Sequence, residues 1–339
     1  MESAIPAHLT VPRTRPSRVP DDFRPAYPSF VARTPESTAQ VVMAYLGAQL
    51  PAGTEPGGVP AALAQALAGP DGPAHHDRAT QVVRDGPVDV VTVAYWDDPA
   101  AFDRWFARHR EPWLTDRDGG GRWVEVIRPR VEEFETIFGA RSRPEGVAVL
   151  AEGFSDQVRE HAYWGGMRDR IPASQTGPLH DPGGLDVERD GDRVRVRPRG
   201  SVCLIRSGQD WTDTAPDERE IYLEDIEPNL RAGMDFLESD GLGIGCFANR
   251  YLTVLDADGR TTERSYGLSW WRTLAELERW SESHPTHLAI FSSFGRMVAA
   301  RGSTKLRLYH EVSVVGPDEQ WFEYAGCHER TGLLAALGS

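Results

Sequence analysis

The sequence predicts an α+β fold in which an antiparallel sheet, with helices on one face, is built twice along the chain. Segments rich in Val, Ile and aromatic residues alternate with amphipathic helical segments, which is typical of layered α+β proteins. Trp96 is followed eight residues later by Arg104-Trp105, and Trp271 is followed eight residues later by Arg279-Trp280. Both strings pass from a predicted strand into a predicted helix, which indicates a repeat. With ten tryptophans in the chain, chance alignment is the alternative.

Composition excludes several classes of protein. The chain has 339 residues, 40% hydrophobic and 26% charged, which is typical of a globular protein with one large core or two lobes. Its formal net charge of −14 opposes binding to phosphate backbones, so we expect no nucleic-acid partner. No apolar run in the sequence is long enough to span a bilayer, and the N-terminus lacks the apolar core of a secretion signal. We therefore expect neither membrane association nor secretion.

The cysteines indicate the redox compartment. Cys203, Cys246 and Cys327 are odd in number and widely spaced, and the sequence contains no C-x-x-C string. This pattern is typical of reduced thiols rather than of a disulfide framework or a structural zinc site. We expect a cytoplasmic protein.

The N-terminal half divides into an arm and a first α+β unit. Residues 1–36 are rich in proline, which fixes φ and removes hydrogen-bond donors, so we expect an extended arm on the surface or on a partner subunit. Residues 37–150 form the first unit. Its expected elements are strands at 40–49, 88–95 and 124–127, a helix at 59–67, and a helix capped by Asp98, with Pro99 at its first position, that ends near Arg108. The string His75-His76-Asp77 is interpreted as a turn.

A connector and a second unit follow. Residues 151–199 form the connector, in which the Pro- and Gly-rich stretch 171–199 is expected to contain one hairpin at 193–197. Connections of this length are uncommon unless they carry function. Residues 200–339 form the second unit, with expected strands at 201–206, 244–255 and 264–270 and a helix at 221–237 that kinks at Pro228.

The helix predicted over 285–301 carries the most informative histidine. Ser283 or His284 caps this helix, and Pro285 fits its first position. His287 opens an apolar stripe at helical spacing, completed by Ile290, Phe291, Phe294 and Val298. Such a histidine is either a core or capping residue, or an axial ligand to a planar apolar cofactor such as haem, which needs an imidazole and aromatic walls. A two-histidine metal site with His284 is a third interpretation, but no nearby carboxylate or third ligand supports it.

The next segment, 305–315, alternates as a strand and places Leu306, Leu308, His310 and Val312 on one face. His310 is therefore a polar residue in a row that is expected to face the core, where an unpartnered imidazole is costly. It is either a core histidine with its hydrogen bonds satisfied or a general acid/base over a ligand.

Two arginine-bearing stretches complete the candidate residues. Residues 206–211 (RSGQDW) are expected to end a strand and turn sharply, which places the Ser207 hydroxyl at a sheet edge. Residues 163–170 (YWGGMRDR) combine aromatic residues, a glycine pair and two cations. Arg168 or Arg170 is either a solvated charge or a clamp on an anion or hydroxyl. The sequence contains no Gly-x-Ser-x-Gly string, phosphate-binding loop or dinucleotide fingerprint.

At these segments the chain resembles the bacterial aldoxime dehydratases, haem enzymes that convert aldoximes to nitriles. The resemblance extends over nearly the whole chain, and its longest strings are highly specific. The matching strings are 1–5 (MESAI), 41–47 (VVMAYLG), 72–77 (GPAHHD), 163–170 (YWGGMRDR), 205–211 (IRSGQDW), 277–287 (LERWSESHPTH) and 306–314 (LRLYHEVSV).

The resemblance implies a fold and a set of site residues. The fold is a haem-holding α+β barrel made of duplicated ferredoxin-like units. By position, His287 matches the proximal haem ligand, beside the aromatic residues Phe291 and Phe294. On the distal side, His310 matches the catalytic histidine, Ser207 the serine that hydrogen-bonds the oxime hydroxyl, Arg170 the distal arginine, and Glu135 a nearby glutamate. Residues 177–191 depart most from the family pattern, so the sequence predicts no substrate size.

The resemblance also implies the reaction. A lyase with ferrous haem b would bind the nitrogen of an aldoxime, R–CH=N–OH, and release a nitrile and water. His310 would first protonate the leaving hydroxyl and then remove the aldehydic proton, a role worth about 10²–10⁴-fold in rate. The family implies a homodimer. Two other functions stay open: a peroxidase-like haem oxidoreductase, and a non-catalytic haem-binding protein on the same fold.

Overall fold

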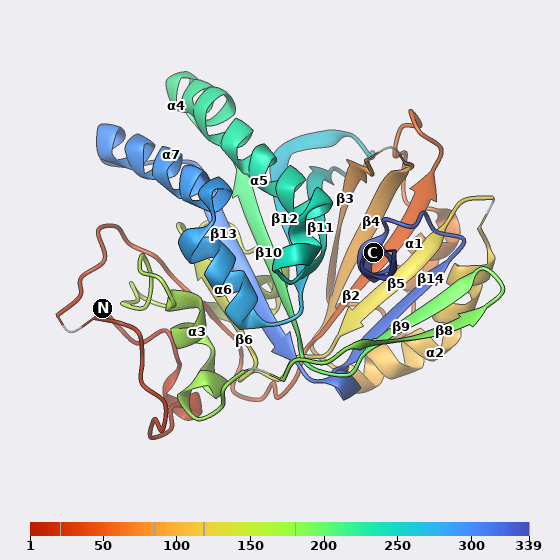
Figure 1. The fold of residues 1–339 in the computed structure, drawn as a ribbon, viewed down its shortest axis with the longest axis horizontal. Helices are drawn as coiled ribbons and strands as arrows, with labels where there is room; N and C mark the ends of the chain where they lie inside the picture. The colour runs from red at the N-terminus through yellow and green to blue at the C-terminus, as the bar shows by residue number, and fades with distance from the viewer. Residues whose placement is uncertain (21, 85, 118, 180, 339) are drawn as a thin grey trace.

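One large antiparallel sheet organises the protein, as the computed structural model shows (Figure 1). The structure describes residues 1–20, 22–84, 86–117, 119–179 and 181–338. Within them, twelve strands pair in the order β6-β13-β10-β12-β11-β3-β4-β2-β5-β14-β9-β8. A small separate sheet pairs β1 (Ala32–Arg33) with β7 (Gly153–Phe154). The α+β fold class expected from the sequence is confirmed.

The two halves of the sheet have the same strand order. The first half contains β2 (Val42–Leu50), α1 (Ala61–Ala68), β3 (His75–Val82), β4 (Val88–Trp96), α2 (Pro99–Thr115) and β5 (Arg122–Ile127). The second half contains β10 (Val202–Asp210), α4 (Pro216–Ile221), α5 (Glu227–Ser239), β11 (Cys246–Leu255), β12 (Thr261–Trp271), α6 (Leu274–Ser283), α7 (Pro285–Arg301) and β13 (Arg307–Val315). Pairing gives β5-β2-β4-β3 in one half and β13-β10-β12-β11 in the other, which is the ferredoxin-like order. The halves join where β11 pairs with β3.

The repeated tryptophans occupy equivalent places in the two halves. Trp96 ends β4 and packs on Trp105 of α2, with ring centroids 5.1 Å apart. Trp271 ends β12 and packs on Trp280 of α6 at 5.7 Å. Each pair ties a helix to the outer face of its half of the sheet, because burial of large aromatic surfaces fixes how the two layers pack.

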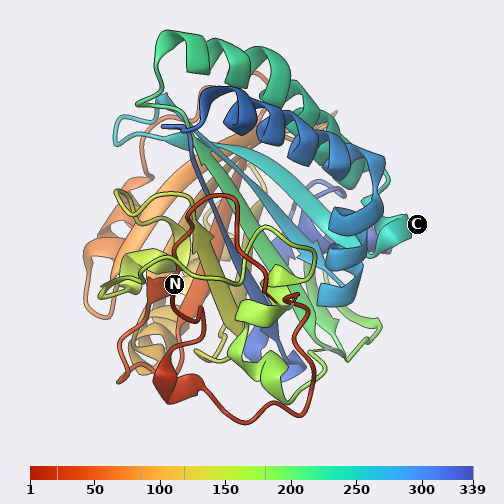
Figure 2. The same ribbon diagram turned by 90° about the vertical axis from the view of Figure 1, so that its left-hand side faces the viewer.

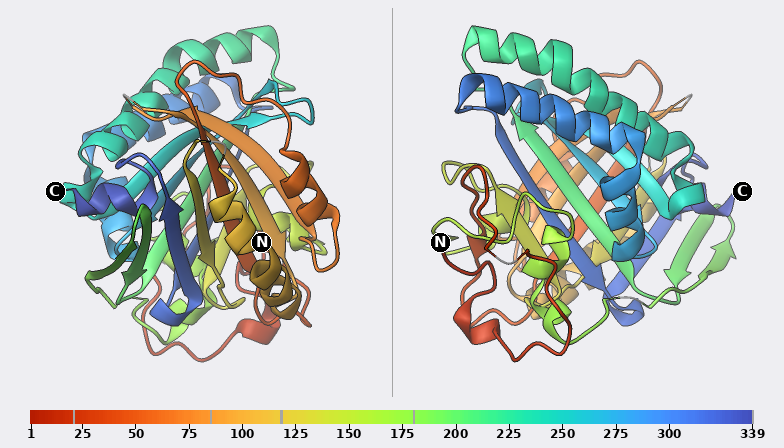
Figure 3. Two further views of the ribbon diagram at one scale, coloured as in Figure 1. Left: turned by 90° about the vertical axis from the view of Figure 1, so that its right-hand side faces the viewer. Right: turned by 60° about the vertical axis from the view of Figure 1, so that its left-hand side comes forward.

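The sheet curves around a shared interior, and the helices cover its outer face. Figure 3 shows α1 and α2 against the first half, and Figure 2 shows α5 and α7 as a layer across the second. The interior holds an apolar core with contributions from both halves, and also polar links such as the hydrogen bond from the Tyr95 hydroxyl of β4 to Glu311 of β13, 3.1 Å long. Pairing among the described strands runs from β6 to β8 without closing, so the barrel is open.

Several elements differ from the sequence-based expectation. The string His75-His76-Asp77 begins strand β3 and is not a turn. Helix α2 continues past Arg108 to Thr115 although it contains Pro112, because Leu114 is buried against the sheet. The helix expected at 221–237 begins earlier, as α4, and continues through a π-helical turn at 222–226 into α5, so its irregular turn lies before Pro228.

Other segments frame the helical side of the second half. Strand β6 (Phe134–Phe138) pairs with β13, and helix α3 (Gly166–Arg170) follows the loop at 155–165. The hairpin expected at 193–197 is longer than predicted, because that range is only its second strand: β8 (Leu185–Asp190) pairs with β9 (Arg193–Pro198), which also pairs with β14 (Gln320–Ala325). Among the described residues, no helix has the length and apolarity needed to cross a membrane.

Candidate functional site

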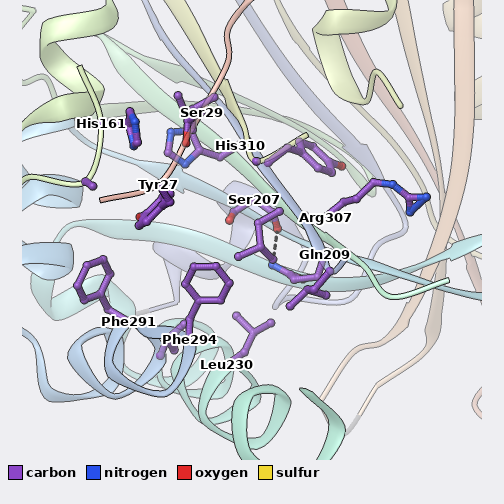
Figure 4. Close-up of a pocket in the computed structure, with 18 of the residues that line it drawn as sticks. Tyr27, Ser29, His161, Ser207, Gln209, Leu230, Phe291, Phe294, Arg307 and His310 are labelled. Atoms are coloured by element: carbon purple, nitrogen blue, oxygen red, sulfur yellow. Dashed lines mark hydrogen bonds between the residues drawn. The ribbon is translucent and has the colours of Figure 1, made fainter. Parts of the chain in front are cut away.

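A large cavity lies between the outer face of the second half-sheet and the helices that cover it (Figure 4). Its volume is about 1420 Å³, larger than the roughly 300–1,000 Å³ that drug-sized ligands occupy. Strands β10, β12 and β13 form the floor, α5 and α7 the roof, and residues 161–170 with Tyr27 a side wall. The lining is mostly apolar, which suits a large, flat and hydrophobic occupant.

His287 presents an uncharged nitrogen donor from the first turn of α7. The His284 side chain caps this helix by accepting a hydrogen bond from the Thr286 backbone N–H at 3.4 Å, and Pro285 occupies the first position. The His287 Nδ1 atom lies 2.7 Å from the Ser281 carbonyl oxygen. A carbonyl only accepts, so Nδ1 carries the proton and Nε2 keeps its lone pair for the cavity that the ring lines.

Burial keeps the His287 ring neutral. The apolar surroundings, including the Trp280 ring at 4.7 Å, lower the pKa of His287 to about 4, and the hydrogen bond to Ser281 opposes this only in part. Charge on His310 lowers the pKa of His287 further, as expected for two rings that face one cavity. His284 does not join His287 in a metal pair, because its ring serves as the helix cap and stacks on Phe236 at 4.1 Å.

A buried trio on the sheet side consists of His310, Glu135 and Arg170. Arg170 and Glu135 form a two-point ion pair, with Nε to Oε2 at 2.7 Å and Nη2 to Oε1 at 3.0 Å. The His310 Nε2 atom lies 2.8 Å from Arg170 Nη2 and 2.9 Å from Glu135 Oε1. The side chains of Glu135 and Arg170 are 1% and 4% exposed, whereas His310 is 22% exposed toward the cavity.

The trio can accommodate either charge state of His310. Burial alone would raise the pKa of the Glu135 carboxyl, but Arg170 and His310 together hold that pKa below its ordinary value. Glu135 therefore stays ionised and neutralises Arg170. An Nε2–H of His310 can donate to Glu135 both in the protonated ring and in the neutral tautomer with a free Nδ1, whereas the other neutral tautomer can accept at Nε2 from Arg170. His310 can therefore gain or lose a proton while each buried charge of the trio keeps a partner.

Ser207 lies opposite His310, and the expected sheet edge was wrong. Strand β10 does not end at Arg206 but continues to Asp210 between β12 and β13, so Ser207 is in the middle of a central strand. It pairs with His310 on β13 and with Gly267 on β12, and the side chains of Ser207 and His310 both line the cavity. Gly267 has no side chain, and the Met234 sulfur lies 2.7 Å from where a Cβ would stand, so this residue allows α5 to approach the sheet beside Ser207.

Of the two arginines in 163–170, only Arg170 reaches the cavity. Arg168 forms an ion pair with Glu278 at 2.6 Å and donates to the Pro178 carbonyl at 2.9 Å, which makes it a structural residue. Helix α3, which carries Arg170, is fixed by the N-terminal arm. The Asp169 carboxylate accepts hydrogen bonds from the backbone N–H groups of Arg18 and Val19, at 2.8 and 2.9 Å.

The cavity lining combines residues expected from the sequence with others that were not. Phe291 and Phe294 of α7 belong to the first group. Tyr27 from the arm belongs to the second and packs on Phe294, with ring centroids 6.5 Å apart. His161 lines the same cavity beside Tyr27. His161 precedes the string 163–170 by two residues but belongs to no periodic pattern, so its place in the site becomes visible only in the assembled cavity.

The residues fit a haem group. A neutral imidazole nitrogen on the α7 wall matches the axial ligand that haem iron requires, and the aromatic and aliphatic lining matches the apolar macrocycle. The hydrogen bond from His287 Nδ1 to a backbone carbonyl is the support that metal-binding histidines commonly have. His310 and Arg170 line the same cavity from the sheet side.

Comparison with known proteins agrees with this geometry. The sequence model of the haem-containing dehydratases matches residues 44–333. An aliphatic aldoxime dehydratase of Rhodococcus globerulus is 43% identical over 346 residues, which cover 98% of each chain. A phenylacetaldoxime dehydratase of Bacillus sp. (strain OxB-1) is 31% identical, with 93% of each chain covered. A crystal structure of an aldoxime dehydratase in complex with butyraldoxime matches with a TM-score of 0.90 at 42% identity, covering 98% of this chain and 96% of that one.

These similarities extend across both halves of the sheet and the cavity between sheet and helices. The expected resemblance and the expected haem cofactor are thereby confirmed, and the fold agrees with that of the solved relatives. The chain is a member of the haem-containing dehydratase family.

Proposed function

We propose that this protein is an aldoxime dehydratase, a lyase that converts R–CH=N–OH to R–C≡N and water. Its relatives support this proposal, since they include aliphatic and phenylacetaldoxime dehydratases and a structure with bound butyraldoxime. The observation that carries it is the His310 ring, held by Arg170 and Glu135 on the sheet wall of the cavity that His287 lines from α7. One wall offers a ligand for iron, and the other offers a proton donor and acceptor.

The proposed roles follow from these positions. His287 would hold haem through Nε2, with the apolar side chains of Phe291 and Phe294 lining its cavity. When bound, haem would supply a reduced iron centre able to bind the oxime nitrogen and weaken the N–O bond. Ser207 holds the oxime oxygen by a hydrogen bond. Protonated His310 gives its proton to the leaving hydroxyl, and water forms as the N–O bond breaks. The same ring, now neutral, accepts the aldehydic proton, so the nitrile forms and His310 returns to its starting state.

Glu135 and Arg170 position His310 and stabilise its charge. Their contacts occupy Nε2, so Nδ1 is the atom left to exchange a proton with the substrate. Glu135 stabilises protonated His310 through its negative charge, while Arg170 keeps that carboxylate ionised. One imidazole can then act as acid and base in turn, because it gives up a proton from one nitrogen and can take one back at the same atom.

We also propose that the enzyme acts as a cytoplasmic homodimer. The three free thiols Cys203, Cys246 and Cys327 support a reducing compartment. Exposed apolar side chains at Trp164, Leu288 and Phe291 support a partner surface near the cavity. Light scattering coupled to size-exclusion chromatography measures the assembly directly, and a mass equal to one chain of 37.6 kDa contradicts it.

The test of the proposed function is anaerobic turnover by the reduced enzyme. Haem-loaded protein is treated with dithionite, mixed with butyraldoxime, and assayed for butyronitrile by gas chromatography. We expect nitrile formation without peroxide or oxygen, since dehydration needs no net oxidant. A requirement for peroxide would identify a peroxidase-like enzyme, and haem binding without nitrile would identify a non-catalytic haem protein.

A further inference from the structure

His161 is a buried histidine without a hydrogen-bond partner. Its exposed fraction is 4%, and neither Nδ1 nor Nε2 forms a hydrogen bond with any described residue. Buried polar atoms in folded proteins are nearly always hydrogen-bonded, to protein, to water or to a ligand. Since His161 lines the cavity, the absent partner is expected to be an occupant of that cavity.

The position of His161 is tied to the trio of Glu135, Arg170 and His310. The Arg170 guanidinium donates through Nη1 to the carbonyl of Glu160 at 2.6 Å and contacts His310 through Nη2 at 2.8 Å. One rigid group therefore connects the backbone beside His161 to the His310 ring. The His161 ring also packs on Tyr27, with centroids 5.3 Å apart, and Figure 4 shows both side chains on the cavity wall.

The turn that carries His161 has a strained backbone. Ala162, the next residue, has a φ of 61°, in the left-handed region that residues other than glycine seldom adopt. Strained backbone of this kind persists where the surrounding structure fixes it, and it is frequent at functional sites. The turn that presents His161 to the cavity is therefore maintained by its surroundings rather than by local preference.

The charges around His161 favour a neutral hydroxyl over a carboxylate as its partner. Burial, and then the nearby Arg170, lower the pKa of His161 to about 4, so the ring is uncharged at neutral pH. Arg170 is already neutralised by Glu135 and leaves no free positive charge for a second anion. Lys305 forms no ion pair among the described residues, but it lies at the exposed rim of the cavity. A neutral imidazole offers one donor and one acceptor, which match a hydroxyl group or water.

We propose that His161 is a second polar residue on the substrate side of the cavity and that it hydrogen-bonds the hydroxyl of the bound aldoxime, then the water released from it. The identity of this hydroxyl rests on the proposed function. His161 thus positions the leaving group for His310 and takes no part in proton transfer itself. Ser207 and His161 would hold the same oxygen from different segments of the chain.

The test compares wild-type holoenzyme with His161→Phe and His161→Gln. The first readout is the C–O stretching frequency of carbon monoxide bound to the dithionite-reduced protein, because that frequency responds to hydrogen-bond donors near the iron ligand. We expect a higher frequency in the Phe variant and a frequency close to wild type in the Gln variant, which retains a donor. Tyr27→Phe is the matched control, since it keeps the ring that packs on His161 and removes only a hydroxyl.

The second readout is the steady-state kinetics of butyraldoxime dehydration. Loss of one neutral hydrogen bond is expected to lower kcat/KM about 5- to 10-fold in His161→Phe, with partial rescue in His161→Gln. An unchanged C–O frequency in both variants overturns the proposal even if activity falls, because the role would then be structural. If the C–O frequency shifts in the variant but the wild-type protein makes no nitrile, the proposed function is refuted. The placement of His161 near the iron ligand would still be supported by the shift.

Discussion

Ser207 and His310 are directly opposed residues on the antiparallel strands β10 and β13. Opposed residues of an antiparallel pair point to the same face of the sheet, so a hydroxyl and an imidazole emerge together into the cavity. On β12, Gly267 pairs with Ser207 and adds no side chain beside them. The sheet register therefore fixes the distance between two polar groups that lie more than a hundred residues apart in sequence.

Ser207→Ala is expected to impair catalysis and leave haem binding intact. The alanine fits the same strand but no longer holds the oxime oxygen, so kcat/KM should fall about 10- to 100-fold. Steady-state assays with butyraldoxime, normalised to haem content, measure the effect. Wild-type kcat/KM in this variant would remove Ser207 from the mechanism.

Glu135→Gln is expected to reduce both stability and activity. The substitution leaves Arg170 buried without a counter-charge, which costs about 3–5 kcal/mol in the free energy of unfolding, and it replaces the charged acceptor for protonated His310 with a neutral amide oxygen. The matched control is Glu125→Gln. That carboxylate forms a similar two-point pair with Arg250, at 2.7 and 2.8 Å, in the sheet interior.

Denaturant unfolding and specific activity separate the two variants. Both should unfold at lower urea concentration, but only Glu135→Gln should lose activity per folded, haem-loaded molecule. Equal activity losses in the two variants would mean that Glu135 acts through stability alone.

His287→Ala is expected to abolish haem retention. Without the Nε2 donor the α7 wall offers the iron no ligand, so the purified variant should show no haem absorption band after reconstitution. His284→Ala is the control, because it removes a helix cap worth about 1 kcal/mol and leaves His287 in place. A normal haem spectrum in the His287 variant would contradict the assignment.

Acid should release haem at low pH rather than near the ordinary pKa of histidine. Burial lowers the pKa of His287 to about 4, so the ring stays neutral as the pH falls through 6 and 5. Protonation of Nε2 removes the lone pair that would bind iron, so haem affinity is expected to decline progressively as the pH falls below about 4. Absorption spectra recorded from pH 7 to pH 3 locate the transition. Release centred near pH 6.5 would show that the ring is not buried as described.

Elements with strong local signals were predicted well from the sequence. Helix α7 begins at Pro285 and ends at Arg301 as expected, because a capping residue, a proline at the first position and an apolar stripe all agree. The alternation in 305–315 predicted a strand with Leu308 and His310 on one face, and both residues line the cavity. The repeated tryptophans marked equivalent strand ends in the two halves.

Residues whose roles depend on distant contacts were harder to place. The string after Arg206 resembles a turn, yet β10 continues through Gly208 because the Tyr309 ring fills the space that a side chain would need. Glu135 becomes part of the site only through the pairing of β6 with β13. His161 stands just before the string 163–170, but its burial and its unpartnered nitrogens arise from a cavity that several separate segments build together.

The most direct test of the account is the dehydration rate of His310→Ala in the reduced, haem-loaded state. The account predicts that haem content and its absorption spectrum remain, because His287 is untouched. It also predicts that nitrile formation falls by about 10²–10⁴-fold, the usual contribution of a general acid/base. Nitrile formation at the wild-type rate by this variant would contradict the central claim that His310 moves the protons of the reaction.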